Sequence, residues 1–215
     1  MDDDERAPGS GARSRVRKPT PEERRAQRAQ VEDPAAVLES GARFLEARPR
    51  SVAEVRRKLS RLGYRLELVT GAVERLAALG FLDDEAFAHG WVESRDRARP
   101  RGEHALRREL GIKGVDKAIV DAVLGDRREE ALGAAEALDE LPASPDDAAA
   151  ERLLRRKLAP ILRETDPRKR GQRAYALLAR NGFGPDVCAA VSRRVLAGVG
   201  TETDEADQET GSPAP

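Results

Sequence analysis

The sequence has few aromatic side chains, one cysteine and no long apolar run. Aromatic residues are 3% of the 215 residues, and Cys188 alone excludes an intramolecular disulfide and a cysteine-based metal cluster. No apolar stretch approaches the roughly 20 residues of a membrane-spanning helix. The opening MDDDERAPGS lacks the basic-then-apolar order of a signal peptide. We therefore expect a cytoplasmic protein that needs no membrane.

Signatures of catalysis and of cofactor binding are also missing. His89 and His104 do not stand at metal-ligand spacing with other ligands, and the sequence has neither a P-loop nor a Gly-x-Gly-x-x-Gly turn. The acidic triplet Asp83–Glu85 precedes an expected helix, where acidic side chains favour the helix dipole, so we interpret it as a cap rather than a metal or acid–base site. Cys188 stands among small apolar residues and is expected to be a buried thiol. We expect a protein that is not an enzyme and has no cofactor.

The net charge is zero, but the charges are unevenly distributed. The chain has 39 basic and 39 acidic side chains, and residues 35–198 carry a net charge of +5. The last 17 residues contain five acidic and no basic side chains. A mildly basic body suggests a polyanion or an acidic protein surface as partner, the alternative being a charge-rich surface that is only solvated.

The two ends contain few large apolar side chains. Because such segments cannot bury enough surface to offset chain entropy, we expect a disordered N-terminal arm over residues 1–33 and a disordered acidic tail over 199–215. Between the ends, capping residues mark the starts of helices, including Asp33-Pro34 and the capping box from Ser51 to Glu54. The segment Asp126–Glu129 resembles another capping box, which would start a new helix. No segment alternates as a strand would, so the predicted fold is all-α.

An internal repeat organises the region between the tails. Three segments share a frame of leucine, glycine four residues on, an apolar residue directly after it, and another apolar residue four later. The frame predicts a helix that ends at a left-handed glycine and a second helix that starts beyond it. We predict three tandem three-helix units, at 34–80, 81–125 and 126–198, in an elongated, curved array. The third unit has an inserted loop or helix extension around 141–147. The frame residues are Leu59, Gly63, Tyr64 and Leu68; Leu110, Gly114, Val115 and Ile119; and Leu178, Gly182, Phe183 and Val187.

The string ARPR occurs at residues 47–50 and again at 98–101, at the same point of the first two units. Its proline and the cap residue after it are structural, because they separate two helices. An arginine doublet follows each copy, and on a helix Arg57 points away from buried Leu59 while Arg56 flanks the buried stripe. Pro167-Arg168 falls near the equivalent place in the third unit. The candidate partner-binding residues are Arg48, Arg50, Arg56, Arg57, Arg99, Arg101, Arg107, Arg108, Arg168 and Arg170.

Each of these arginines also has a structural interpretation. It could solubilise a small helix and pair with a nearby carboxylate, for which Glu54, Glu103 and Glu109 are the candidates. The recurrence of the arginines at one register of the repeat favours partner binding for the set as a whole. Trp91, four residues after Phe87 on an expected helix, is interpreted as a core residue.

Three stretches resemble the RecX family of bacterial recombination regulators: PRSVAEVRRKLSRLGY, LGFLDDEAFAHGWVESR and RPRGEHALRRELGIKGV. The resemblance covers roughly residues 35–198. It implies three three-helix units and a non-enzymatic modulator of the RecA recombinase in recombination, DNA repair and the SOS response. Family members bind the RecA–single-stranded DNA filament in its groove and suppress ATP hydrolysis, strand exchange and co-protease activity, and some also bind DNA. The third unit matches through Arg170, Leu177, Leu178, Gly182, Phe183 and Val187.

Two functional hypotheses are compared at this point, and a generic scaffold is a third, less favoured one. The favoured one is a monomeric inhibitor that binds the RecA filament through its basic faces, with the backbone of single- or double-stranded DNA as a further candidate contact. The alternative is a helical-repeat DNA-binding protein that acts without RecA, since helix–turn–helix units with outward arginines can grip phosphates. The modest positive charge and the scarcity of aromatic residues for base stacking favour the first.

Overall fold

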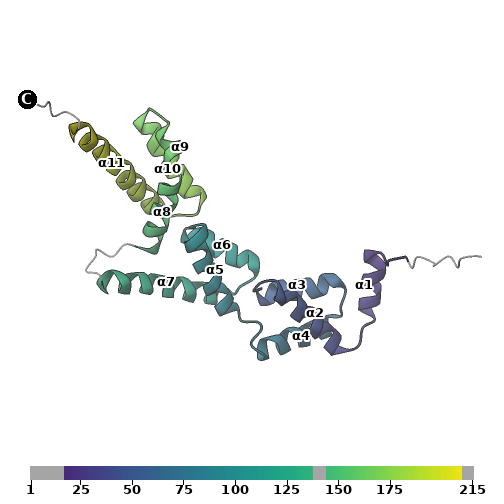
Figure 1. Cartoon of the computed structure of the whole chain (residues 1–215). Coiled ribbons are helices and arrows are strands. Elements are labelled where there is room, and N and C mark those ends of the chain that lie inside the picture. Colours follow the sequence, from purple (N-terminus) through teal and green to yellow (C-terminus); the bar gives the residue numbers. More distant parts are fainter. Residues whose placement is uncertain (1–16, 138–143, 210–215) are drawn as a thin grey trace, which may run out of the picture.

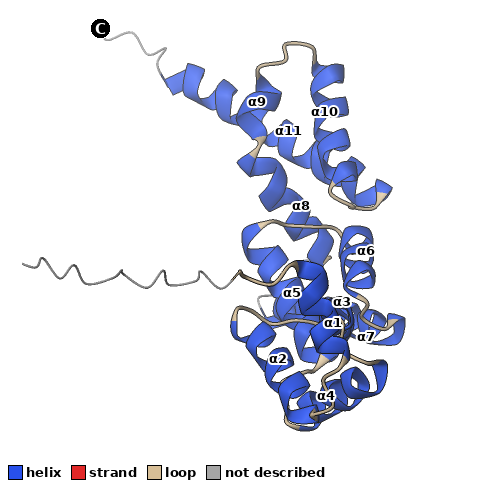
Figure 2. Cartoon of the chain, turned by 90° about the vertical axis from the view of Figure 1, so that its right-hand side faces the viewer, coloured by secondary structure: helices blue, strands red, loops and turns tan. Residues whose placement is uncertain are grey.

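The computed structural model describes residues 17–137 and 144–209, with side chains described over 17–133 and 144–198. These parts of the chain contain eleven helices and no strand, which confirms the predicted all-α fold (Figure 2). The helices are α1 (Pro21–Ala29), α2 (Pro34–Glu46), α3 (Val52–Leu62), α4 (Leu66–Ala78), α5 (Asp84–Ala98), α6 (Glu103–Lys113), α7 (Lys117–Ala137), α8 (Pro145–Arg156), α9 (Leu158–Leu162), α10 (Pro167–Arg180) and α11 (Pro185–Glu209).

The helices form three units along an elongated, bent array (Figure 1). Unit 1 consists of α2, α3 and α4, and unit 2 consists of α5, α6 and α7. Unit 3 contains α8 to α11, with α8 and α9 separated at Lys157. Each unit has its own cluster of buried apolar side chains, centred on Leu59, Leu110 and Leu178. The hydrophobic effect therefore stabilises each unit mainly from within.

The repeat frame is confirmed at all three positions. The glycines that end α3, α6 and α10 are left-handed, with φ values of 105° at Gly63, 84° at Gly114 and 85° at Gly182. The leucine four residues before each glycine is fully buried. A left-handed backbone is costly for a residue with a Cβ, which explains the recurrence of glycine.

Helix α1 lies within the segment for which the sequence predicts no stable structure. Its start has a capping box, because the Thr20 N–H donates to the Glu23 carboxylate at 2.7 Å and the Glu23 N–H donates to the Thr20 hydroxyl at 3.2 Å. Pro21 occupies the first helical position, but no residue of α1 is buried. Local capping, rather than burial, accounts for this helix. At the other end, α11 continues to Glu209, and residues 1–16 and 210–215 lie outside the described residues.

The helix predicted to start at Asp126 is not a separate helix. Helix α7 runs without a break from Lys117 to Ala137, so the capping-box prediction is wrong and position 126 lies inside a helix. The Asp126 carboxylate lies 3.5 Å from Nε2 of His89 instead of capping a helix start. Tertiary contacts of α7 override the local signal. Part of the expected loop, residues 141–143, lies outside the described residues.

Trp91 and Cys188 are placed as the sequence predicts. Trp91 is partly buried against the core of unit 2, and its ring centroid lies 6.0 Å from that of Phe87. Cys188 is fully buried in unit 3, and burial raises the pKa of its thiol. No helix in the described ranges is long and apolar enough to span a membrane.

Candidate functional site

The first ARPR copy forms the joint between units 1 and 2. The Ser51 hydroxyl, which caps α3, donates a 2.7 Å hydrogen bond to the carbonyl of Lys113 at the end of α6. The next backbone N–H, of Val52, donates to the carboxylate of Asp84 at 2.9 Å. The start of α3 is therefore docked on both the end of α6 and the start of α5.

The second copy makes the same joint between units 2 and 3. The N–H of Gly102, the residue equivalent to Ser51, donates to the carbonyl of Asn181 at 3.1 Å. The N–H of Glu103 donates to the Asp146 carboxylate at 2.9 Å. The two joints therefore share their register. The residue after each ARPR copy starts a helix, as the sequence predicts, and it also docks on the following unit, which the sequence did not predict.

The frame glycines also allow close approach at the joints. A Cβ on Gly114 would lie 2.5 Å from the Cβ of Ala53, and a Cβ on Gly182 would lie 2.4 Å from that of Ala105. These distances are shorter than van der Waals contact allows. The frame glycine is thus required for its backbone conformation and also because the preceding unit packs directly on it.

Charged side chains surround the first joint. Glu54 lies 2.8 Å from Nζ of Lys113 and 3.7 Å from the guanidinium of Arg48. Burial alone would raise the pKa of Glu54, but the hydrogen bond and charge of Lys113 and the N–H of Ser51 outweigh it and lower that pKa. Burial raises the pKa of Asp84, opposed by the hydrogen bond from Val52. The joint therefore contains two carboxylates whose pKa values move in opposite directions.

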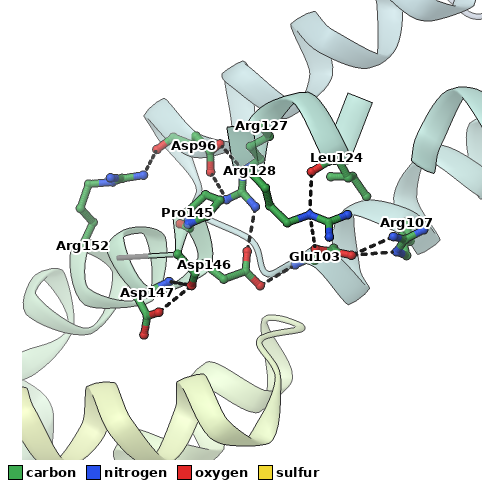
Figure 3. Close-up of polar contacts among 11 residues, drawn as sticks. Asp96, Glu103, Arg107, Leu124, Arg127, Arg128, Pro145, Asp146, Asp147 and Arg152 are labelled. Atoms are coloured by element: carbon green, nitrogen blue, oxygen red, sulfur yellow. Dashed lines mark hydrogen bonds and ion pairs between the residues drawn. The ribbon is translucent and has the colours of Figure 1, made fainter. Parts of the chain in front are cut away.

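Arg127 of α7 is the centre of the second joint (Figure 3). Two of its nitrogens donate to Asp96 of α5, each at 2.9 Å, and a third donates to Asp146 of α8 at 2.8 Å. Its side chain is 9% exposed. Burial alone would lower the pKa of Arg127, but the hydrogen bonds to the two carboxylates outweigh burial and raise that pKa. Because Asp146 also accepts from the backbone N–H of Glu103, one polar network connects α5, α6, α7 and α8.

Several predicted partner-binding arginines are engaged within the chain. Arg57 donates to the carbonyls of Ile112 at 3.3 Å and Lys113 at 2.9 Å, across the first joint. Arg107 pairs with Glu103 at 2.8 Å and with Asp121. Hydrogen bonds to both carboxylates raise the pKa of Arg107.

Two further predicted arginines have contacts near the joints. Arg50 lies over the ring of Phe44, with its guanidinium carbon 4.3 Å from the ring centroid. Arg101 donates to the side-chain oxygen of Asn181, and its Nε lies 3.5 Å from Glu109. Of the three candidate carboxylates, Glu54 pairs with Arg48, Glu103 with Arg107 and Glu109 with Arg101.

The remaining predicted arginines have free guanidinium groups. These five side chains make no hydrogen bond or ion pair with the described residues: Arg56, Arg99, Arg108, Arg168 and Arg170. The first four are exposed and Arg170 is partly buried. The two doublets therefore differ. In unit 1 the first arginine, Arg56, has no partner in the described parts of the chain and the second, Arg57, is hydrogen-bonded. In unit 2 the first arginine, Arg107, is paired and the second, Arg108, has no partner among the described residues.

The sequence did not identify the residues that hold the units together. Asp84 and Asp146 stand in the first turns of α5 and α8, which matches the local preference of acidic residues for helix starts. Their second role, as acceptors for the preceding unit, depends on tertiary structure. Arg127 lies 31 residues from Asp96 and 19 from Asp146 in the sequence, so no local sequence pattern predicts the network.

The fold and its joints define a helical-repeat protein of three homologous units that dock through polar contacts and expose arginines beside those contacts. Comparisons with known proteins identify the family. Residues 38–76 match the first three-helix domain of RecX, and residues 83–124 match the second. The chain belongs to the RecX family of regulatory proteins.

Curated relatives and solved structures agree with this assignment. A protein named regulatory protein RecX from Mycobacterium tuberculosis (strain H37Rv) is 34% identical over 158 residues, which cover 72% of this chain and 83% of the relative. The protein of the same name from Mycobacterium avium is 32% identical over 155 residues, covering 72% and 82%. A crystal structure of regulatory protein RecX aligns with a TM-score of 0.60 at 21% identity, covering 74% of this chain and 71% of that one. The structure of RecX from Lactobacillus salivarius aligns with a TM-score of 0.57 at 18% identity, covering 76% and 96%. These two likenesses concern the fold.

Proposed function

We propose that the chain is a monomeric cytoplasmic regulator that binds the filament of RecA on single-stranded DNA. Binding inhibits RecA ATP hydrolysis, strand exchange and co-protease activity, and so modulates recombination, DNA repair and the SOS response. The chain has no catalytic role in this proposal. Membership of the RecX family supports the class of regulator, and the exposed arginines beside the joints support a charged, repetitive partner.

The free arginines are the proposed contact residues. Arg56 and Arg108 are exposed and project from successive units, and Arg99, Arg168 and Arg170 extend the set. Arg57, Arg101 and Arg107 instead hold the chain's own helices, so their loss would act through structure. An elongated array with cations at intervals suits a long target with a repeating acidic surface.

The RecA ATPase assay tests this proposal. The protein should lower DNA-dependent ATP hydrolysis by RecA at concentrations at which it leaves naked single-stranded DNA unbound. Anisotropy of labelled DNA without RecA provides the control. Inhibition that appears only at concentrations that coat free DNA would refute filament binding and support the alternative, a helical-repeat DNA-binding protein that acts without RecA.

Paired variants test the contact residues. The double variant Arg56→Gln/Arg108→Gln should weaken filament binding and flatten its salt dependence, with an unchanged melting temperature. The variant Arg57→Gln/Arg107→Gln removes the same charge from the paired positions and should lower the melting temperature. Unchanged inhibition by the first, folded variant would show that Arg56 and Arg108 do not contact the partner.

A further inference from the structure

Each joint has a hollow beside its ARPR copy. The hollow at the first joint is lined by Arg48, Pro49 and residues of α5. The hollow at the second is lined by Arg99, Pro100 and residues of α8, together with Lys157 and Asn181. Trp91 and Leu153 occupy corresponding wall positions, because each follows the aspartate of its joint by seven residues. The repeat therefore places two hollows at the same register, and their linings can be compared directly.

The two hollows differ in chemistry. The first, of about 310 Å³, has an apolar and aromatic wall that includes Phe87 and Trp91, with Arg48 as the cation. The second, of about 530 Å³, has four cations and no carboxylate in its wall. These cations are Arg99, Arg101, Arg156 and Lys157. Ser94 of the first wall corresponds to Arg156 of the second, so a cation replaces a neutral residue at one register of the repeat.

Two guanidinium groups of the second hollow are held in place by the chain itself. Nη1 of Arg156 donates to the carbonyl of Ala98 at 3.1 Å, and Nη1 of Arg101 donates to the Asn181 side chain. A guanidinium carries five N–H donors, so each retains donors for a ligand. Fixing the side chains in advance lowers the entropy cost of binding.

The described residues neutralise only part of the charge in this hollow. Glu109 lies 3.5 Å from Nε of Arg101 and does not line the hollow. The side chains of Arg99 and Lys157 make no hydrogen bond or ion pair with the described residues. Among the described residues, no carboxylate pairs with Arg99, Arg156 or Lys157. A single carboxylate of a partner would not balance these three charges. Successive phosphates of a nucleic-acid strand bring one negative charge each and match the fork of arginine.

We propose that the hollow beside Arg99 and Lys157 binds backbone phosphates of single-stranded nucleic acid. Arg156 and Arg101 form the fixed part of the site, and Arg99 and Lys157 are its cations without a partner among the described residues. The inference deepens the proposed function, because the ligand is the strand on which the RecA filament is built. The phosphate site is tested on DNA without RecA, so that this inference and the proposed binding to the RecA filament can fail separately. With only a few phosphates engaged, naked DNA binds weakly and with strong dependence on salt.

The experiment measures the anisotropy of a short fluorescein-labelled oligothymidine over a series of salt concentrations. The variant Arg99→Gln/Lys157→Gln should flatten the slope of log affinity against log salt by about 1.4, since each phosphate contact on a single strand contributes about 0.7. At about 0.1 M salt this change corresponds to a loss of roughly 25-fold in affinity. The matched control Arg65→Gln/Lys117→Gln removes two exposed cations away from the hollow and should leave the slope nearly unchanged.

Each outcome bears on the site. Equal slopes for the two double variants would overturn the proposal. Competition by inorganic pyrophosphate at the affinity of the oligothymidine would point to a free phosphate ligand instead of a strand and would overturn it too. If the Arg99→Gln/Lys157→Gln variant binds DNA normally but loses RecA inhibition, the hollow binds an acidic protein surface, and only the filament proposal survives. Weakened DNA binding with intact RecA inhibition supports the phosphate site independently of the filament contact.

Discussion

The hydroxyl of Ser51 donates a 2.7 Å hydrogen bond to the carbonyl of Lys113, 62 residues further along the chain. The same hydroxyl accepts from the N–H of Glu54 at 3.2 Å and thereby caps α3. One buried side chain therefore caps the start of a helix in one unit and joins that helix to the next unit.

Replacing Ser51 with alanine should remove both bonds. We expect Ser51→Ala to lower the free energy of unfolding by about 2 kcal/mol, since a lost cap costs about 1 kcal/mol and the Lys113 carbonyl keeps only the hydrogen bond from Arg57. Urea denaturation followed by circular dichroism measures the change. The control Ser60→Ala, at an exposed position of α3, should change the stability little. A Ser51→Ala variant as stable as this control would contradict the joint described above.

The frame glycines should respond differently from a left-handed glycine outside the joints. Gly182→Ala adds a Cβ that would lie 2.5 Å from the backbone nitrogen of Ala105, and backbone cannot move aside cheaply. Gly80 also has a positive φ, of 76°, but nothing lies within 4 Å of an added Cβ. Gly80→Ala should therefore cost about 1 kcal/mol from backbone strain alone. Gly182→Ala should cost about 2 kcal/mol more, from overpacking. Equal melting temperatures for the two variants would disprove the close approach.

Arg127 should be required for coupling between units 2 and 3. Arg127→Met keeps an apolar stem but leaves Asp96 and Asp146 without their cation, which should cost about 3 kcal/mol. Because each unit has its own core, we also expect urea unfolding to separate into two transitions. Arg128→Met is the control, since the neighbouring Arg128 side chain is 51% exposed. A single transition at the wild-type midpoint would show that the network does not couple the units.

Acid should weaken the contribution of Glu54 to stability. The folded protein lowers the pKa of Glu54, so its stabilising effect is present above the ordinary carboxyl pKa and is lost as the pH falls through the lowered value. Glu54→Gln should therefore destabilise the protein clearly at about pH 7 and much less at about pH 3. Chemical denaturation at both pH values measures the difference. The exposed control Glu74→Gln should show no such dependence, and an equal loss at both pH values for Glu54→Gln would exclude an ionised role.

Local signals in the sequence were sufficient for the repeat and its turns. The leucine, glycine and capping residues of each unit act within one or two helical turns, so their spacing predicted the helix ends around Gly63, Gly114 and Gly182. The joints were not predictable in this way. Arg57 does face outward from its own helix, as the helical geometry indicates, but outward from α3 means toward the end of α6. Asp126 shows a different kind of error. Its spacing from Glu129 predicts a helix start, but the contacts of α7 keep this position inside a continuous helix.

The joint also limits where another unit could be added. In α3 and α6 the first helical N–H, from Val52 or Glu103, is free to reach the aspartate of the following unit. Relative to its frame glycine, α10 begins one turn earlier, and the corresponding residue, Gly171, lies inside the helix, where N–H groups bond within the helix. The first residue of α10 is Pro167, which has no N–H to donate. The array thus has a polarity: α3 and α6 each dock on the following unit through this N–H, whereas α10 lacks the corresponding donor, so the same bond could not join a further unit to α10.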